Sequence, residues 1–90
     1  MKPQINRTVP TVDDLAVALT EGKFGDYEIR KQKLGAKYES IQALANLSYG
    51  IESRENVIRL LREAVADGIY GQEETLRQRL GDWYDDVVKQ

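Results

Sequence analysis

The stretch "EGKFGDYEIRKQKLGAKY" at Glu21–Tyr38 decides the fold of this chain, because a variant of it returns as "DGIYGQEETLRQRLGDWY" at Asp67–Tyr84. A single shift of 46 positions, from Glu21 to Asp67, aligns the two stretches. The identical pairs include Gly22 with Gly68, Gly25 with Gly71, Leu34 with Leu80, Gly35 with Gly81 and Tyr38 with Tyr84. A fixed period of this size marks a repeated supersecondary unit. The sequence therefore predicts two copies of one small unit.

Each copy has the pattern of three short helices. In the first copy, Thr11 is a suitable N-cap with Asp14 three residues later, and an apolar stripe then runs at helical spacing to Gly22. Asp26, Ser53 and Asp82 are further candidate caps. No segment alternates with period two, so strands are not expected. We expect an all-α fold of two tandem three-helix bundles, six short helices in total, and one fused six-helix bundle is the alternative.

The repeat also defines the domain boundaries. We assign residues 1–11 to a linker-like N-terminal segment, 12–47 to the first copy, 48–56 to a connector and 57–90 to the second copy. Residues 1–11 lack the apolar centre of a secretory signal, and no apolar run is long enough to cross a bilayer. No signal peptide and no membrane partner are expected.

Composition argues against several functions. With 41% hydrophobic and 31% charged residues the chain reads as globular. The formal net charge of −2 lacks the basic patch that nucleic acid requires, so no nucleic-acid partner is expected. The chain has no histidine and no cysteine, which removes the commonest general base and the strongest nucleophile. The carboxylate pairs Asp13–Asp14, Glu73–Glu74 and Asp85–Asp86 are interpreted as solvated helix surface. We expect no enzyme activity, no metal site and no cofactor.

The most informative segment is the loop after the first helix of each copy, "GKFG" in one and "GIYG" in the other. Two glycines around an aromatic residue allow a tight turn that either presents the ring or tucks it into the end of the bundle. In the first copy Asp26 and Arg30 lie one helical turn apart beside this loop, and Tyr38 begins the next helix. An aromatic ring, an arginine and a carboxylate suit a ligand that carries sugar rings and carboxylates.

The ordered pattern of these residues resembles the CW-seven cell-wall-binding repeat, found as tandem C-terminal repeats in bacteriophage lysozymes (endolysins) and related wall hydrolases. The similar segments are "VDDLAVALTEGKFGDYEIRKQKLGAKYESIQALANL" at Val12–Leu47 and "VIRLLREAVADGIYGQEETLRQRLGDWYDDVVKQ" at Val57–Gln90. In the first copy the motif falls on Gly22, Phe24, Gly25, Asp26, Arg30, Leu34, Tyr38, Ile41, Gln42 and Asn46. The resemblance implies three-helix repeats that recognise the muropeptide unit of peptidoglycan, a disaccharide with a peptide stem, without catalysis.

The resemblance also implies the ligand-binding residues. In the first copy they are Phe24, Gly25, Asp26, Arg30, Tyr38 and Gln42, and in the second copy Tyr70, Gly71, Gln72, Arg77 and Tyr84. The chain departs from the family in three respects. The usual tryptophan is Phe24 or Tyr70, the usual Asn-Gly after the loop is absent, and Leu76 stands where the first copy has Arg30. Each of these residues also has a structural interpretation, with Tyr38 and Tyr84 in the core and Gln42 on plain helix surface.

We therefore expect a non-catalytic module that acts at the bacterial cell wall, targets a covalently linked or associated lytic enzyme domain, and uses its two copies for avidity. The alternative is a small helical protein–protein interaction module, of phage or regulatory origin, in which the glycines only end helices. In that alternative Trp83 and Tyr84 mark the protein interface.

Overall fold

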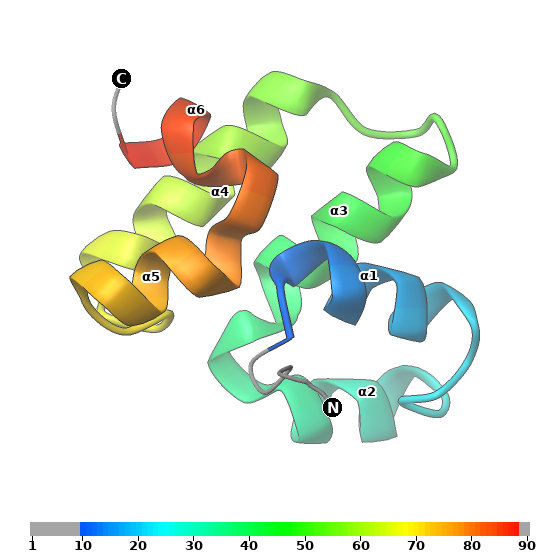
Figure 1. Cartoon of the computed structure of the whole chain (residues 1–90). Helices are drawn as coiled ribbons and strands as arrows, with labels where there is room; N and C mark the ends of the chain where they lie inside the picture. The colour runs from blue at the N-terminus through cyan, green and yellow to red at the C-terminus, as the bar shows by residue number, and fades with distance from the viewer. Residues whose placement is uncertain (1–9, 89–90) are drawn as a thin grey trace, which may run out of the picture.

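The computed structural model describes residues 10–88, and every regular element in this part of the chain is helical (Figure 1). The expected all-α class is confirmed. The elements of the first copy are α1 (Val12–Thr20), α2 (Tyr27–Leu34), the 3-10 turn η1 (Gly35–Lys37) and α3 (Tyr38–Ser48). Those of the second copy are α4 (Arg54–Ala66), α5 (Glu73–Leu80), the 3-10 turn η2 (Gly81–Trp83) and α6 (Tyr84–Val88). Most of the expected N-terminal linker, residues 1–9, lies outside the described residues.

The expectation of six separate helices is wrong. In residues 10–88 the helical residues form four uninterrupted segments, because η1 joins α2 directly to α3 and η2 joins α5 directly to α6. Gly35 and Gly81 have φ of 57° and redirect the chain, but the next residues continue as a 3-10 turn closed by a bond from Tyr38 or Tyr84 to the glycine carbonyl. Asp82, expected to cap the last helix, therefore lies inside η2.

The helix starts agree more closely with the sequence. Thr11 and Asp14 form the predicted capping box at α1, with each side chain bonded to the other's backbone N–H at 3.0 Å. Ser53 caps α4 by accepting a bond from the Asn56 backbone N–H. Asp26 occupies the N-cap position of α2, but its side chain makes no capping bond.

A single hydrophobic cluster contains the buried residues of both copies. Helix α3 packs against α1 within its own copy and against α4 of the other copy, so the two halves of the molecule meet along α3 and α4 (Figure 1). The largest of the fully buried side chains come from both copies: Val12, Ile41, Val57, Leu61, Tyr70 and Leu80. This shared core corresponds to the fused alternative, and two bundles with independent cores are not seen.

Two polar contacts fasten the copies together. The hydroxyl groups of Ser40 in α3 and Tyr70 in the second glycine loop lie 2.6 Å apart and are buried. The Trp83 indole donates to the Asp13 carboxylate in α1 at 3.0 Å. Buried hydroxyls need such partners, so these bonds also define how the two copies are oriented. Within residues 10–88, no helix has the length and apolar character needed to cross a membrane.

Candidate functional site

Arg30 is the centre of a polar network on the first copy. Its Nη1 donates to the Gln42 side-chain oxygen at 2.9 Å, and its Nη2 lies 3.5 Å from the carbonyl oxygen of Gly25. Gln42 in turn donates to the Asn46 side-chain oxygen at 3.1 Å. The structure thus brings together four residues of the motif, from the glycine loop, α2 and α3. Each Nη has a second N–H, so the guanidinium retains donors for a ligand.

The glycine loop supplies the backbone part of this network. Gly25 has φ of 79°, a conformation that favours glycine, and a Cβ placed there would lie 3.1 Å from Cγ2 of Ile29. The loop is therefore closed tightly onto the first turn of α2, which directs the Gly25 carbonyl toward Arg30. Phe24 is half-buried against the core, and Asp26 is exposed at the start of α2. Among residues 10–88 no ion pair joins Asp26 to Arg30.

Two tyrosines and a lysine lie on α2 and at the start of α3. The rings of Tyr27 and Tyr38 meet edge to face, with centroids 6.1 Å apart. The Lys31 ammonium lies 5.0 Å from the Tyr27 centroid and 5.9 Å from the Tyr38 centroid. Tyr38 is half-buried and Tyr27 exposed, so both rings retain surface on which a sugar or an apolar group can pack.

A polar groove runs between α3 and α4. It is open to solvent, has a volume of about 420 Å³, and includes Gln42 and Asn46 of the Arg30 network in its wall. The residues that line it are Tyr38, Glu39, Gln42, Ala43, Asn46, Arg59, Leu60 and Glu63. We refer to it as the α3–α4 groove. Because α3 and α4 belong to different copies, this groove exists only when the two copies pack together.

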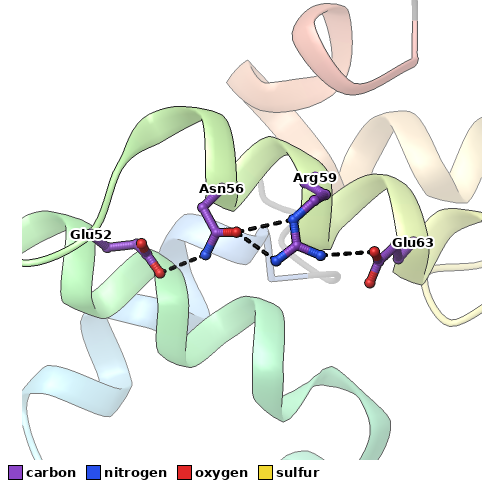
Figure 2. Close-up of polar contacts among 4 residues, drawn as sticks. All are labelled: Glu52, Asn56, Arg59 and Glu63. Carbon is purple, nitrogen blue, oxygen red and sulfur yellow. Dashed lines mark hydrogen bonds and ion pairs between the residues drawn. The ribbon is translucent and has the colours of Figure 1, made fainter.

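Arg59 and Glu63 of the groove belong to a chain of polar contacts that begins at Glu52 in the connector and continues along α4 (Figure 2). The Asn56 side-chain amide donates to the Glu52 carboxylate at 2.8 Å. The Asn56 side-chain oxygen accepts from Nη2 and Nε of Arg59 at 2.6 and 3.1 Å. Nη1 of Arg59 donates to the Glu63 carboxylate at 2.9 Å. These contacts place Arg59 and Glu63 side by side along the groove, where both side chains stay exposed. Sequence reasoning missed this set, although the spacing of three and four residues on one helix predicts such neighbours.

The expected binding residues of the second copy are arranged differently. The Tyr70 side chain has no exposed surface, so it forms part of the core and has no surface for a ligand in this structure. Leu76, which replaces Arg30 in the repeat, is buried as well. Gly71 repeats the positive φ of Gly25, at 86°, and Gln72 is exposed. No counterpart of the Arg30 network forms among the described residues of this copy.

Arg77 and Tyr84 make a separate contact. The guanidinium carbon of Arg77 lies 4.5 Å from the Tyr84 ring centroid, and the Tyr84 hydroxyl donates to the Glu73 carboxylate at 3.0 Å. This hydrogen bond, followed by burial, raises the pKa of Tyr84 above its ordinary value. Only 7% of Tyr84 and 6% of Trp83 is exposed to solvent. Neither ring therefore forms the protein-binding surface that the protein–protein interaction alternative assigned to them.

The carboxylate pairs have structural partners. Asp13 accepts from Trp83, Asp14 belongs to the capping box, and Asp86 pairs with Arg54. Within residues 10–88 no group of three or more carboxylates is placed to hold a metal ion. The interpretation of these pairs as solvated surface was therefore incomplete, because several of them fix helices to one another.

Comparisons of the chain with protein-family models, with curated proteins and with solved structures found no match. The resemblance to the cell-wall-binding repeat therefore depends on the residues quoted above alone.

Proposed function

We propose that this chain is a non-catalytic peptidoglycan-binding module that directs a linked or associated lytic enzyme to the bacterial cell wall. The ligand is the muropeptide unit, a disaccharide that carries a peptide stem. The binding surface consists of the Arg30 network, the Tyr27 and Tyr38 rings, and the adjoining α3–α4 groove.

One observation carries this proposal. Arg30, Gln42, Asn46 and the Gly25 carbonyl are distant in the sequence but form one hydrogen-bonded network at the surface of the first copy. A guanidinium fixed in this way is prepared to bind a carboxylate of the peptide stem through its free N–H groups. The tyrosine rings provide flat apolar surface for a sugar ring. The open groove offers room for the rest of the chain-like ligand.

The two copies contribute unequally in this proposal. The first copy has the assembled network, whereas Tyr70 and Leu76 of the second copy are buried at the corresponding positions. The second copy then serves mainly to complete the core and the α4 wall of the groove. Avidity from a second site stays a prediction, and the number of ligand molecules bound per chain tests it.

The protein–protein alternative has less support than its sequence basis indicated, because Trp83 and Tyr84 are buried. Tyr49 and Ile51 of the connector are the two most exposed large apolar side chains in residues 10–88, so we place such an interface there. A Tyr49→Ser, Ile51→Ser double variant separates the two functions. The wall-binding proposal expects this variant to bind isolated cell walls as tightly as the parent chain.

Co-sedimentation with purified cell walls tests the proposal directly. We expect the parent chain to sediment with the walls, and Arg30→Ala to weaken binding by at least about tenfold, because a charged hydrogen-bond donor is lost. Lys33→Ala is the matched control, since Lys33 is a cation on the same helix as Arg30, is exposed and is not part of the Arg30 network. Equal binding by the parent chain and Arg30→Ala, with helicity unchanged, would show that the site is wrongly assigned.

A further inference from the structure

A second, smaller pocket lies between the two copies, away from the α3–α4 groove. It is partly enclosed, with a volume of about 80 Å³, and is lined by Pro10, Val12, Leu15, Lys37, Tyr70 and Arg79. We call it the interface pocket. Its apolar lining comes from Pro10, Val12, Leu15 and the Tyr70 ring, and because Val12 and Tyr70 are fully buried, Pro10 and Leu15 provide its accessible apolar surface. Its two charged side chains, Lys37 and Arg79, are both cations. The Tyr70 hydroxyl is already paired with Ser40, so the polar character of the pocket comes from Lys37 and Arg79.

The two cations have no anionic partner in the described part of the chain. No ion pair or side-chain hydrogen bond joins Lys37 or Arg79 to a carboxylate of residues 10–88. The remaining residues, 1–9 and 89–90, contain no Asp or Glu side chain. The chain therefore places two positive charges at one pocket and supplies no acidic side chain to balance them. Two like charges at one partly enclosed pocket repel each other, and an anion from solution bound there would reduce this repulsion.

The electrostatics of Lys37 support this argument. Partial burial, and then the positive charge of Arg79, lower the pKa of the Lys37 ammonium group. The same Arg79 charge acts on the Tyr70 phenol, where it opposes the larger effect of burial on the pKa. A bound anion would remove this destabilisation of the charged lysine.

We propose that the interface pocket binds a small carboxylate with a short aliphatic substituent. Arg79 presents a planar fork that matches a carboxylate, and Lys37 contributes a second charge. The volume admits a few heavy atoms, and the accessible apolar surface of Pro10 and Leu15 suits a methyl or ethyl group, with the buried Val12 and Tyr70 side chains behind it. This site differs from the Arg30 network in position and in residues, and it does not depend on the wall-binding proposal.

An NMR titration with propionate at constant ionic strength tests the inference. We expect saturable shifts of the Val12 and Leu15 methyl and Tyr70 ring resonances, with millimolar affinity, and no comparable shifts when sodium chloride replaces propionate. Arg79→Gln should weaken the affinity at least tenfold, and Lys37→Gln should weaken it severalfold. Lys33→Gln is the matched control, because Lys33 is the repeat counterpart of Arg79 and is exposed on α2.

Three outcomes would overturn the inference. The first is that the shifts follow ionic strength alone, and the second is that the parent chain and Arg79→Gln bind propionate with equal affinity. The third is that inorganic phosphate binds more tightly than propionate. The dispersion of the amide spectrum checks that each variant is folded. A variant that does not fold is replaced by Arg79→Lys, for which we expect retained charge but weaker binding, since lysine lacks the planar fork.

Discussion

At the scale of single residues, Tyr70 was expected to bind the ligand and is instead part of the core in this structure. Its counterpart Phe24 is half-buried at the equivalent loop, whereas Tyr70 is fully buried and bonded to Ser40 of the other copy. The bond to Ser40 satisfies the phenol hydroxyl, which allows the Tyr70 ring to fill the core. The sequence allows the aromatic ring of the glycine loop either to be presented to a ligand or to be tucked into the core. Only the position of α3 decides which of the two occurs.

Tyr70→Phe tests this role. We expect the free energy of unfolding to fall by about 1 kcal/mol at neutral pH, since a buried hydrogen bond is lost while the ring remains. Ser40 keeps its bond to the Lys37 carbonyl at 3.2 Å, which limits the cost. Urea unfolding of the single variants and of the Tyr70→Phe, Ser40→Ala double variant measures the coupling. Fully additive effects would contradict a direct bond.

The same residue predicts a pH dependence. Burial raises the pKa of Tyr70 above its ordinary value of 10.0, although the Ser40 bond and Arg79 oppose this. Because the unfolded chain then loses the phenol proton first, the stability that Tyr70 contributes is present below pH 10 and is lost as pH rises through the folded pKa. Unfolding midpoints measured from pH 8 to 11 should fall less steeply with increasing pH for Tyr70→Phe than for the parent chain. Parallel curves for the two proteins would contradict the assignment.

Lys37 should respond in the opposite direction. Its pKa is lowered in the folded chain, so the unfolded chain binds more protons and stability rises with pH between the folded pKa and about 10.5. Arg79→Gln removes one cause of the shift, and we expect the Lys37 pKa to increase in this variant. NMR titration of the lysine side chains in both proteins measures this change. An unchanged Lys37 pKa would show that Arg79 does not act on it.

At the scale of elements, the glycine loops determine where α2 and α5 begin. The side chains of Asp26 and Gln72 make no capping bonds, so local capping does not account for these starts. By contrast, the α1 and α4 starts use side-chain caps and were predictable, because a cap lies within three residues of the bond that it makes. The joined helices at Gly35 and Gly81 were not predictable, because a glycine with positive φ usually ends a helix.

A pair of substitutions separates backbone conformation from crowding in the first loop. Gly22 and Gly25 have nearly equal φ, 80° and 79°, but a Cβ at Gly22 meets nothing within 4 Å whereas one at Gly25 meets Ile29 at 3.1 Å. We expect Gly22→Ala to cost about 1 kcal/mol of stability and Gly25→Ala to cost more. Gly25→Ala should also weaken wall binding, because it displaces the carbonyl beside Arg30. Equal costs from thermal unfolding would contradict the close packing of the loop on α2.

At the scale of the whole molecule, the shared core connects folding to the site. The sequence predicted the helical class and the repeat, because both depend on local pattern. It left open whether the copies fuse, because the bonds between Ser40 and Tyr70 and between Asp13 and Trp83 join residues far apart in the chain. The Arg30 network contains residues named through the resemblance, and their role in binding stays a prediction. The contacts of Glu52, Asn56, Arg59 and Glu63 were missed because these residues belong to the connector and the other copy.

Cooperative unfolding is the prediction at this scale. Because one hydrophobic cluster spans both copies, we expect a single transition in which Trp83 fluorescence and total helicity change together. Chemical denaturation followed by fluorescence and by circular dichroism measures this. A chain cut after Leu47 should lose most of its helicity, since it would expose the α3 face that packs on α4. Two separated transitions would instead indicate independent bundles.

The most direct test of the central claim is a two-dimensional NMR titration of the folded chain with a soluble disaccharide-peptide fragment of peptidoglycan. The account predicts saturable shifts at Gly25, Arg30, Gln42 and Asn46, extending to Arg59 and Glu63 across the groove, with no matching set around Gly71. Shifts absent at millimolar ligand, or confined to the second copy, would contradict it.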